Sequence, residues 1–240
     1  MGSVYKRLLI GAAVLLTVFL MVRINIKSQN PGLILIFAAA AALLFFYFMF
    51  ERGTASSKEI ALTAVLAAAA AAGRLPFAFI PGVQPTTFLV IVSGRALGCR
   101  AGFMVGSTAA LISNIFLGQG PWTLWQMLSW GLAGVSAGMI DRLAPGIGRG
   151  GMTVFSFLWG YLFGWIIDLW YWAAFVDPLN LKTLLGVFAA SFWFDTAHAL
   201  GNGIFYYLFG DRVFKMIRRC SRRFSVEILY TLPGKAERTR

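Results

Sequence analysis

Apolar runs repeat along almost the whole chain, and short stretches rich in charge, proline or glycine separate them. Most of these runs are close to the ~20 residues that a helix needs to cross a bilayer. We therefore predict an all-α polytopic membrane protein with eight helical segments. Their expected ranges are 7–25, 32–50, 58–72, 87–98, 101–117, 122–140, 152–174 and 184–210.

Composition agrees with this pattern. Hydrophobic residues make up 59% of the 240 residues, charged residues only 12%, and the mean hydropathy is +0.75. These values are typical of a membrane protein, and they leave no room for a separate soluble domain. The first apolar run lacks a small-residue cleavage site before Arg23, so we expect it to be retained and not removed as a signal peptide.

The basic residues predict an orientation. Nine of the 21 basic residues lie between 212 and 240, after the last apolar run, which fits contact with anionic membrane lipid or a cytoplasmic partner and not with nucleic acid. If the N-terminus is inside, 17 basic residues lie on the cytoplasmic side and four lie outside. We therefore expect a multi-pass protein with both termini in the cytoplasm and the 73–87 loop outside.

The 73–87 loop interrupts the apolar pattern with three prolines, Pro76, Pro81 and Pro85. Such a stretch cannot form a regular helix. Non-helical backbone between membrane helices is tolerated where protein covers it or where it lines a wet cavity. The loop is therefore either an ordinary connection stiffened by proline or a gate over a small-molecule site.

Small residues fall on regular helical stripes. Alanines repeat along one face of the third segment, and glycine pairs at four-residue spacing occur at Gly102/Gly106, Gly134/Gly138 and Gly160/Gly164. Such stripes allow helix backbones to approach closely in lipid. We expect the glycines to pack helices within the bundle. The alanine stripe is a candidate docking face for another subunit, and its members are Ala61, Ala64, Ala68 and Ala72.

Polar and aromatic residues gather toward the predicted outer side. An Asp inside the bilayer is costly unless it faces a partner or a wet cavity, so Asp168 and Asp195 indicate a polar interior. Asp195, His198 and Asn202 share one helical face. The spacing is compatible with two roles for this patch. It either binds a ligand or stabilises the fold, and a buried Asp195–Arg74 ion pair would be an example of the second role.

The stretches GRLPFAFIPGVQPTTFLVIVSG and RAGFMVGSTAALISNIFLGQGPWTLWQMLSWGLAG, with the alanine-rich helix before them, resemble the substrate-binding membrane subunit (S component) of energy-coupling factor vitamin transporters. The resemblance covers about residues 58–215. It implies a six-helix substrate-binding bundle at 56–215, a two-helix N-terminal extension at 1–55 and a basic cytoplasmic tail at 216–240. The two additional helices depart from the usual six.

The resemblance implies a vitamin importer of the bacterial plasma membrane and not an enzyme. The S component captures a vitamin or precursor outside, and a corrinoid such as cobalamin is one candidate here. It docks through its alanine-rich helix on a transmembrane coupling subunit that carries two ATPase subunits. This chain has no phosphate-binding G-x-x-x-x-G-K-[ST] motif of its own, so a partner must hydrolyse ATP.

On this interpretation the 73–87 loop closes over the ligand, polar groups orient it and tryptophans supply flat apolar walls. The expected substrate-binding residues are Gln84, Thr86, Thr87, Asn114, Gln119, Trp122, Trp125, Gln126, Trp165, Asp168, Trp172, Asp195, His198 and Asn202. We expect no cofactor and no metal. The two cysteines have no metal-ligand spacing, and His198 is better read as a satisfied interior histidine than as a cobalt ligand.

Two other functions compete with this prediction. Residues 197–201 resemble the AHxxG helix of rhomboid intramembrane serine proteases, and 92–94 resemble part of their GxSG motif, although Ile91 replaces its first glycine. Ser93 would then be the nucleophile and His198 its base, but the predicted depths of the two residues differ. The third possibility is a membrane assembly protein without a ligand.

Overall fold

The computed structural model describes residues 31–52 and 56–224, and this part of the chain is helical without a strand. The predicted all-α class is thus confirmed for the described residues. The α-helices are α2 (Pro31–Glu51), α3 (Ser57–Arg74), α4 (Thr86–Leu97), α5 (Cys99–Leu117), α6 (Trp122–Leu143), α7 (Arg149–Phe175) and α8 (Leu181–Phe224), and a short 3-10 helix, η1 (Leu75–Phe77), follows α3.

The helix ends match the predicted segments within a few residues, with one large exception. Helix α8 continues to Phe224, well past the expected end at 210 and past the expected start of the tail at 216. The predicted segment 7–25 lies outside the described residues. Consequently only the second helix of the predicted N-terminal extension can be placed.

Within residues 31–52 and 56–224, four stretches are long and apolar enough to cross a membrane, as expected for a membrane protein. They are Pro31–Glu51, Ser57–Phe77, Cys99–Leu117 and Arg149–Phe175. Helix α4 is apolar but has 12 residues, so at 1.5 Å per residue it covers only about 18 Å of a ~30 Å hydrocarbon core. The eight-span topology remains a prediction.

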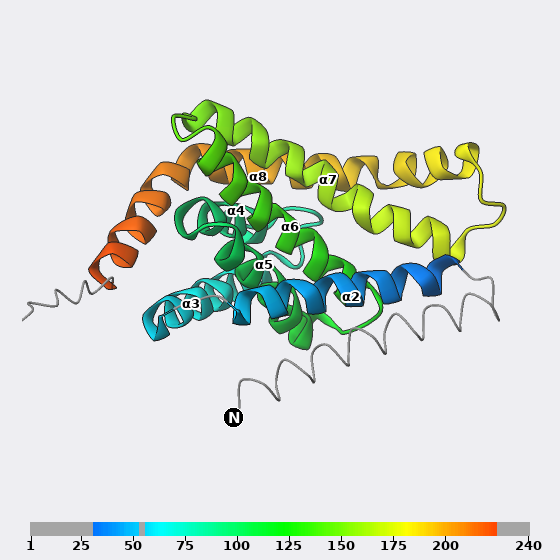
Figure 1. The fold of residues 1–240 in the computed structure, drawn as a ribbon. Coiled ribbons are helices and arrows are strands. Elements are labelled where there is room, and N and C mark those ends of the chain that lie inside the picture. Colours follow the sequence, from blue (N-terminus) through cyan, green and yellow to red (C-terminus); the bar gives the residue numbers. More distant parts are fainter. Residues whose placement is uncertain (1–30, 53–55, 225–240) are drawn as a thin grey trace, which may run out of the picture.

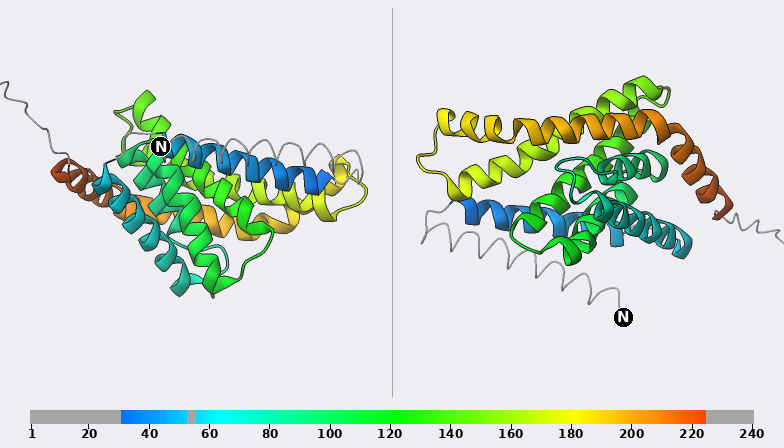
Figure 2. Two further views of the ribbon diagram at one scale, coloured as in Figure 1. Left: turned by 60° about the horizontal axis from the view of Figure 1, so that its bottom comes forward. Right: turned by 180° about the vertical axis from the view of Figure 1, so that it is seen from behind.

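The helices pack around α4, α5 and α6 (Figure 1). Helices α7 and α8 run side by side as a long hairpin whose turn projects beyond the central helices, and α8 bends in its C-terminal part (Figures 1 and 2). Helix α2 lies on the opposite side of the centre from α8 and contacts α5, α6 and α7. The second predicted helix therefore flanks the bundle directly.

Aromatic side chains attach α2 to this bundle. The Phe46 ring stacks on Phe103 of α5 with centroids 4.2 Å apart, and the Tyr47 hydroxyl lies 3.1 Å from the Ser107 hydroxyl. Two turns further toward the N-terminal end of α2, buried Ala39 packs against the stacked pair Trp125 and Trp170. These contacts run along much of the helix, so α2 is part of the packed structure.

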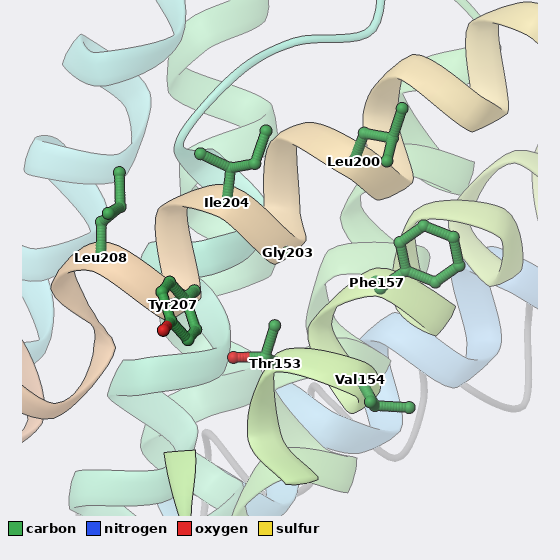
Figure 3. A pocket seen from close by; sticks show the side chains of 8 residues that line it. All are labelled: Thr153, Val154, Phe157, Leu200, Gly203, Ile204, Tyr207 and Leu208. Atoms are coloured by element: carbon green, nitrogen blue, oxygen red, sulfur yellow. The ribbon is translucent and has the colours of Figure 1, made fainter. Parts of the chain in front are cut away.

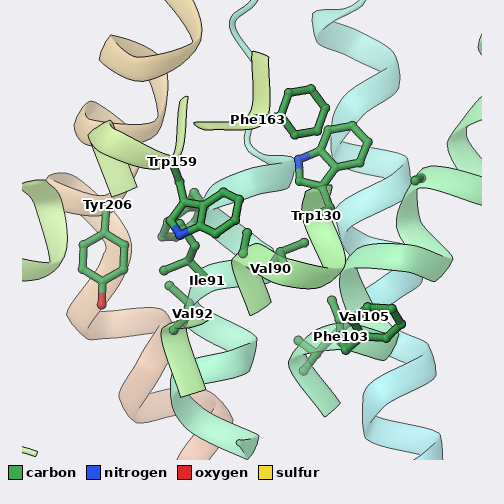
Figure 4. Packing of buried hydrophobic residues seen from close by; sticks show 14 of the residues in the cluster. Val90, Ile91, Val92, Phe103, Val105, Trp130, Trp159, Phe163 and Tyr206 are labelled. Atoms are coloured by element: carbon green, nitrogen blue, oxygen red, sulfur yellow. The ribbon is translucent and has the colours of Figure 1, made fainter. Parts of the chain in front are cut away.

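The core lies where α4, α5, α6, α7 and α8 meet (Figure 4). Its largest fully buried side chain is Trp130, whose ring packs on Phe163 at 4.6 Å between centroids. Helices α4, α5 and α6 come close because glycines face each other. A Cβ at Gly134 would overlap the Gly102 carbonyl, and one at Gly94 would overlap the Gly134 carbonyl. The glycines pack helices, as their spacing predicted.

An ionic cluster lies at the end of the bundle where α4 ends. The Arg95 side chain is 7% exposed, donates to the Tyr206 hydroxyl and the Ile147 carbonyl at 2.9 Å each, and lies 3.4 Å from Asp141. Arg218 of α8 also bonds Asp141, at 3.1 Å. The cluster therefore connects α4, α6 and α8 to the loop before α7.

Candidate functional site

The loop between α3 and α4 lies directly against α8. Gly82 has φ +77°, which a residue with a side chain rarely adopts, and a Cβ there would lie 2.6 Å from the Phe194 carbonyl oxygen. The next loop residue, Val83, lies next to Gly201, which is about two turns of α8 after Phe194. The loop thus covers the stretch of α8 that carries His198, and a glycine is what permits this close approach.

Thr86 and Thr87 belong to the first turn of α4 and not to the loop, which is shorter than the sequence predicted. Both side chains are fully buried. The Thr86 hydroxyl donates to the Ala70 carbonyl of α3 at 3.1 Å, and Thr87 contacts His198 and Trp130. In this conformation both threonines bind protein groups.

Arg74, the last residue of α3, is the centre of a polar network. Its Nε donates to Gln84 Oε1 at 3.1 Å, and its Nη1 donates to Ser113 Oγ at 2.8 Å and to Asn114 Oδ1 at 2.6 Å. The guanidinium also lies over the Trp130 ring, 4.9 Å from its centroid. Three helices and the loop therefore hold this charge in a defined position. We name this group the Arg74 site.

The Arg74 site continues into α6 through Asn114, which is almost completely buried. The Asn114 amide donates to Gln126 Oε1 at 2.7 Å and to the Thr123 hydroxyl at 3.0 Å. Thr123 in turn donates to Gln119 Oε1 at 2.9 Å. The predicted residues Gln84, Asn114, Gln119 and Gln126 are thus brought together by hydrogen bonds, and Arg74, Ser113 and Thr123 are added to them.

Trp130 connects the Arg74 site to α8. Its indole Nε1 donates to the Thr87 hydroxyl at 2.8 Å, and this hydroxyl lies 2.8 Å from His198 Nε2. The other ring nitrogen of His198 and both polar side-chain atoms of Asn202 are buried without a hydrogen-bond partner in the described structure. His198 is therefore linked to the network, whereas Asn202 on the same helical face is not.

Asp195 does not pair with Arg74, so the ion pair considered from the sequence is wrong. Its Oδ2 instead accepts from the Ser191 hydroxyl at 2.9 Å, and the same hydroxyl lies 2.6 Å from Asp168 Oδ2. A hydroxyl has one proton to donate, so both contacts are hydrogen bonds only if one of the two carboxyl groups is itself protonated. The two acids form a second, separate polar cluster between α7 and α8.

The four predicted tryptophans do not share one environment. Trp122 and Trp165 are 42% and 43% exposed, Trp125 is buried against Trp170 and α2, and Trp172 donates to Thr183 at the α7–α8 turn. The tryptophan at the Arg74 site is Trp130, which sequence reasoning did not select. Its position one turn after Gln126 on the same face of α6 was the available signal.

The predicted alanine face of α3 is exposed. Ala61, Ala64, Ala68 and Ala72 are all exposed, whereas Ala67, Ala70 and Ala71 on the other face are buried against the bundle. The α3 helix begins with a Ser56 cap that accepts from the Glu59 amide and ends at Arg74. One helix therefore carries both the exposed alanine face and the central residue of the Arg74 site.

Ser93 and His198 make separate hydrogen bonds. The Ser93 hydroxyl donates to the Leu89 carbonyl of its own helix at 2.7 Å, and His198 Nε2 contacts Thr87, six residues before Ser93. No Ser93–His198 hydrogen bond occurs in the described structure. The pairing that a serine protease needs is absent from this conformation.

An apolar groove of about 560 Å³ lies on the outer face of the α7–α8 hairpin (Figure 3). Its walls are Val154 and Phe157 of α7 and Leu200, Ile204 and Leu208 of α8, most of which are exposed. None of the predicted ligand residues lines it. Its walls are almost entirely apolar, so the groove lacks the placed polar groups that a site for a polar vitamin needs.

Comparison with known proteins adds no relative: the chain matches no protein-family model, no curated protein and no solved structure.

Proposed function

We propose that this protein is the substrate-binding subunit of an ATP-driven vitamin importer of the bacterial plasma membrane, of the energy-coupling factor type. It binds a vitamin or precursor at its outer side, with a corrinoid such as cobalamin as one candidate. It then docks on a transmembrane coupling subunit with two ATPase subunits. The observation that carries this proposal is that α3 combines an exposed alanine face with a polar site at its end.

The alanine face supports the docking step. Small side chains let a second helix approach closely in lipid, and in the described structure no helix covers the four outer alanines. The loop after α3 supports the binding step, because it delivers Gln84 to the Arg74 site and lies on α8. A movement of α3 on docking would therefore act directly on the ligand site.

The test separates binding from docking. Purified protein is screened for thermal stabilisation by water-soluble vitamins, and any co-purified compound is identified by mass spectrometry. Ala64→Trp and Ala68→Trp should abolish uptake by the complete importer while leaving ligand binding unchanged. Ala189→Trp, at an exposed alanine of α8, is the matched control and should leave uptake intact.

Each outcome is informative. Uptake that survives both α3 changes would remove the docking face from the proposal. A protein that no vitamin stabilises, and that carries no bound compound, would contradict the binding function itself and favour an assembly role.

A further inference from the structure

We propose that the Arg74 site binds an oxyanion of the ligand, a carboxylate or a phosphate group. This inference rests on the proposed function, because it names the chemistry that the same site would recognise. It is carried by a charge without an acidic partner among the described residues and by the unused hydrogen-bond donors beside it.

Arg74 has no acidic partner in the described part of the chain. The ion pairs there join Arg95, Arg149 and Arg218 to Asp141 and Asp211 at the other end of the bundle. Asp168 and Asp195 share Ser191 instead. The three side chains that bind the Arg74 guanidinium are all neutral. A half-buried cation among apolar helices is costly without a counter-charge, which an anionic ligand would supply.

Several N–H donors of the site remain unused in the described structure. Arg74 Nη2 makes no hydrogen bond in the described structure, since only Nε and Nη1 are used. The side-chain carbonyl oxygens of Gln84 and Gln126 accept hydrogen bonds from Arg74 and Asn114, respectively, and their NH₂ groups make no hydrogen bond in the described structure. None of these three nitrogens is sealed from solvent. A set consisting only of N–H donors around a fixed guanidinium fits an oxyanion.

The guanidinium is also oriented in advance. Its hydrogen bonds and its position over Trp130 hold it before any ligand arrives. Little side-chain entropy is then lost on binding, and Nη2, which makes no hydrogen bond among the described residues, keeps both of its N–H bonds for an oxygen of a carboxylate or phosphate.

The experiment compares matched compounds that differ in one anionic group. The probes are pantothenate and panthenol, biotin and biotinamide, nicotinate and nicotinamide, and riboflavin 5′-phosphate and riboflavin. Dissociation constants are measured on the purified full-length protein. For the pair that binds, we expect the wild type to prefer the anionic member. Arg74→Gln should weaken that member by about 10-fold to 100-fold and remove the preference.

Two variants keep the test valid. Lys182→Gln removes an exposed cation on the same predicted side and should leave the preference unchanged. Gln84→Glu places a carboxylate 3.1 Å from Arg74 Nε while keeping the size of the side chain. We expect it to raise the melting temperature and to exclude the anionic member, even if Arg74→Gln folds poorly.

A neutral member that binds the wild type as tightly as its anionic partner would overturn the oxyanion site and leave the transport function standing. A preference that survives Arg74→Gln in folded protein would overturn it equally. If no compound binds the wild type and none co-purifies, both the oxyanion site and the proposed function fail.

Discussion

The crossing of α5 and α6 at Gly102 and Gly134 makes a strong prediction about stability. In Gly134→Ala the new Cβ meets backbone atoms of Gly102, which cannot rotate away as a flexible side chain would. The two helices must therefore separate, together with α4, which approaches Gly134 through Gly94.

The magnitude follows from two opposing effects. Overpacking a well-packed site costs about 1–3 kcal/mol, and backbone contacts place this site at the upper end. The higher helix propensity of alanine stabilises the folded state by about 1 kcal/mol relative to glycine and offsets part of this cost. We expect a net loss of about 2 kcal/mol, which lowers the melting temperature by about 4–8 °C for a chain of this size.

The measurement is thermal unfolding of the purified protein in detergent, with Gly186→Ala as the control. Gly186 is an exposed helical residue of α8 with nothing within 4 Å of its Cβ position, so the same substitution should be neutral or stabilising there. A Gly134→Ala protein that melts at or above the wild-type temperature, or together with Gly186→Ala, would refute the close crossing.

Three further predictions concern other parts of the molecule. Arg95→Gln should cost about 1–3 kcal/mol of unfolding free energy, because Tyr206 loses its buried partner and Asp141 keeps only Arg218. Arg149→Gln, at an exposed arginine, should cost at most about 1 kcal/mol, and equal effects in denaturation curves would contradict the burial of the cluster. Tyr47→Phe should lower the free energy of unfolding by about 0.5–1.5 kcal/mol, because it removes the hydroxyl that contacts Ser107. Tyr171→Phe, at an exposed tyrosine, is the control, and equal stability of the two variants would argue against docking of α2 on α5. Gly82→Ala should lift the loop from α8 and speed ligand dissociation. Gly118 also has a positive φ but nothing within 4 Å of its Cβ position, so Gly118→Ala should show only the backbone strain, and equal dissociation rates of the two variants would contradict the loop contact.

The positions of the helices could be read from the sequence, because apolar runs and breaking residues act locally. Segment 122–140 became α6 at Trp122–Leu143, and 152–174 became α7 at Arg149–Phe175. The end of α8 could not be read in this way. Its last turns are amphipathic, and Ile217 is buried against the bundle, so packing extends the helix beyond the point where the apolar run stops.

The candidate site was only partly predictable. Gln84, Asn114 and Gln126 are predicted because they lie in the 73–87 loop or near the expected outer side, and hydrogen bonds do connect them through Arg74 and Asn114. Trp122 and Trp165 were selected by residue type alone and lie exposed. Residue type cannot tell a tryptophan that faces the interior from one at the membrane interface.

The sequence by itself determined that this is an apolar helical protein, roughly where its helices lie, and that α3 has one face of alanines. These properties depend on composition and on the helical period, which neighbouring residues set. Only the tertiary structure decided that Arg74 meets Asn114, 40 positions away, and not Asp195, and that Thr87 meets His198, 111 positions away. Such partnerships depend on how closely the helices cross, and this distance is set by glycines and side chains on several helices at once.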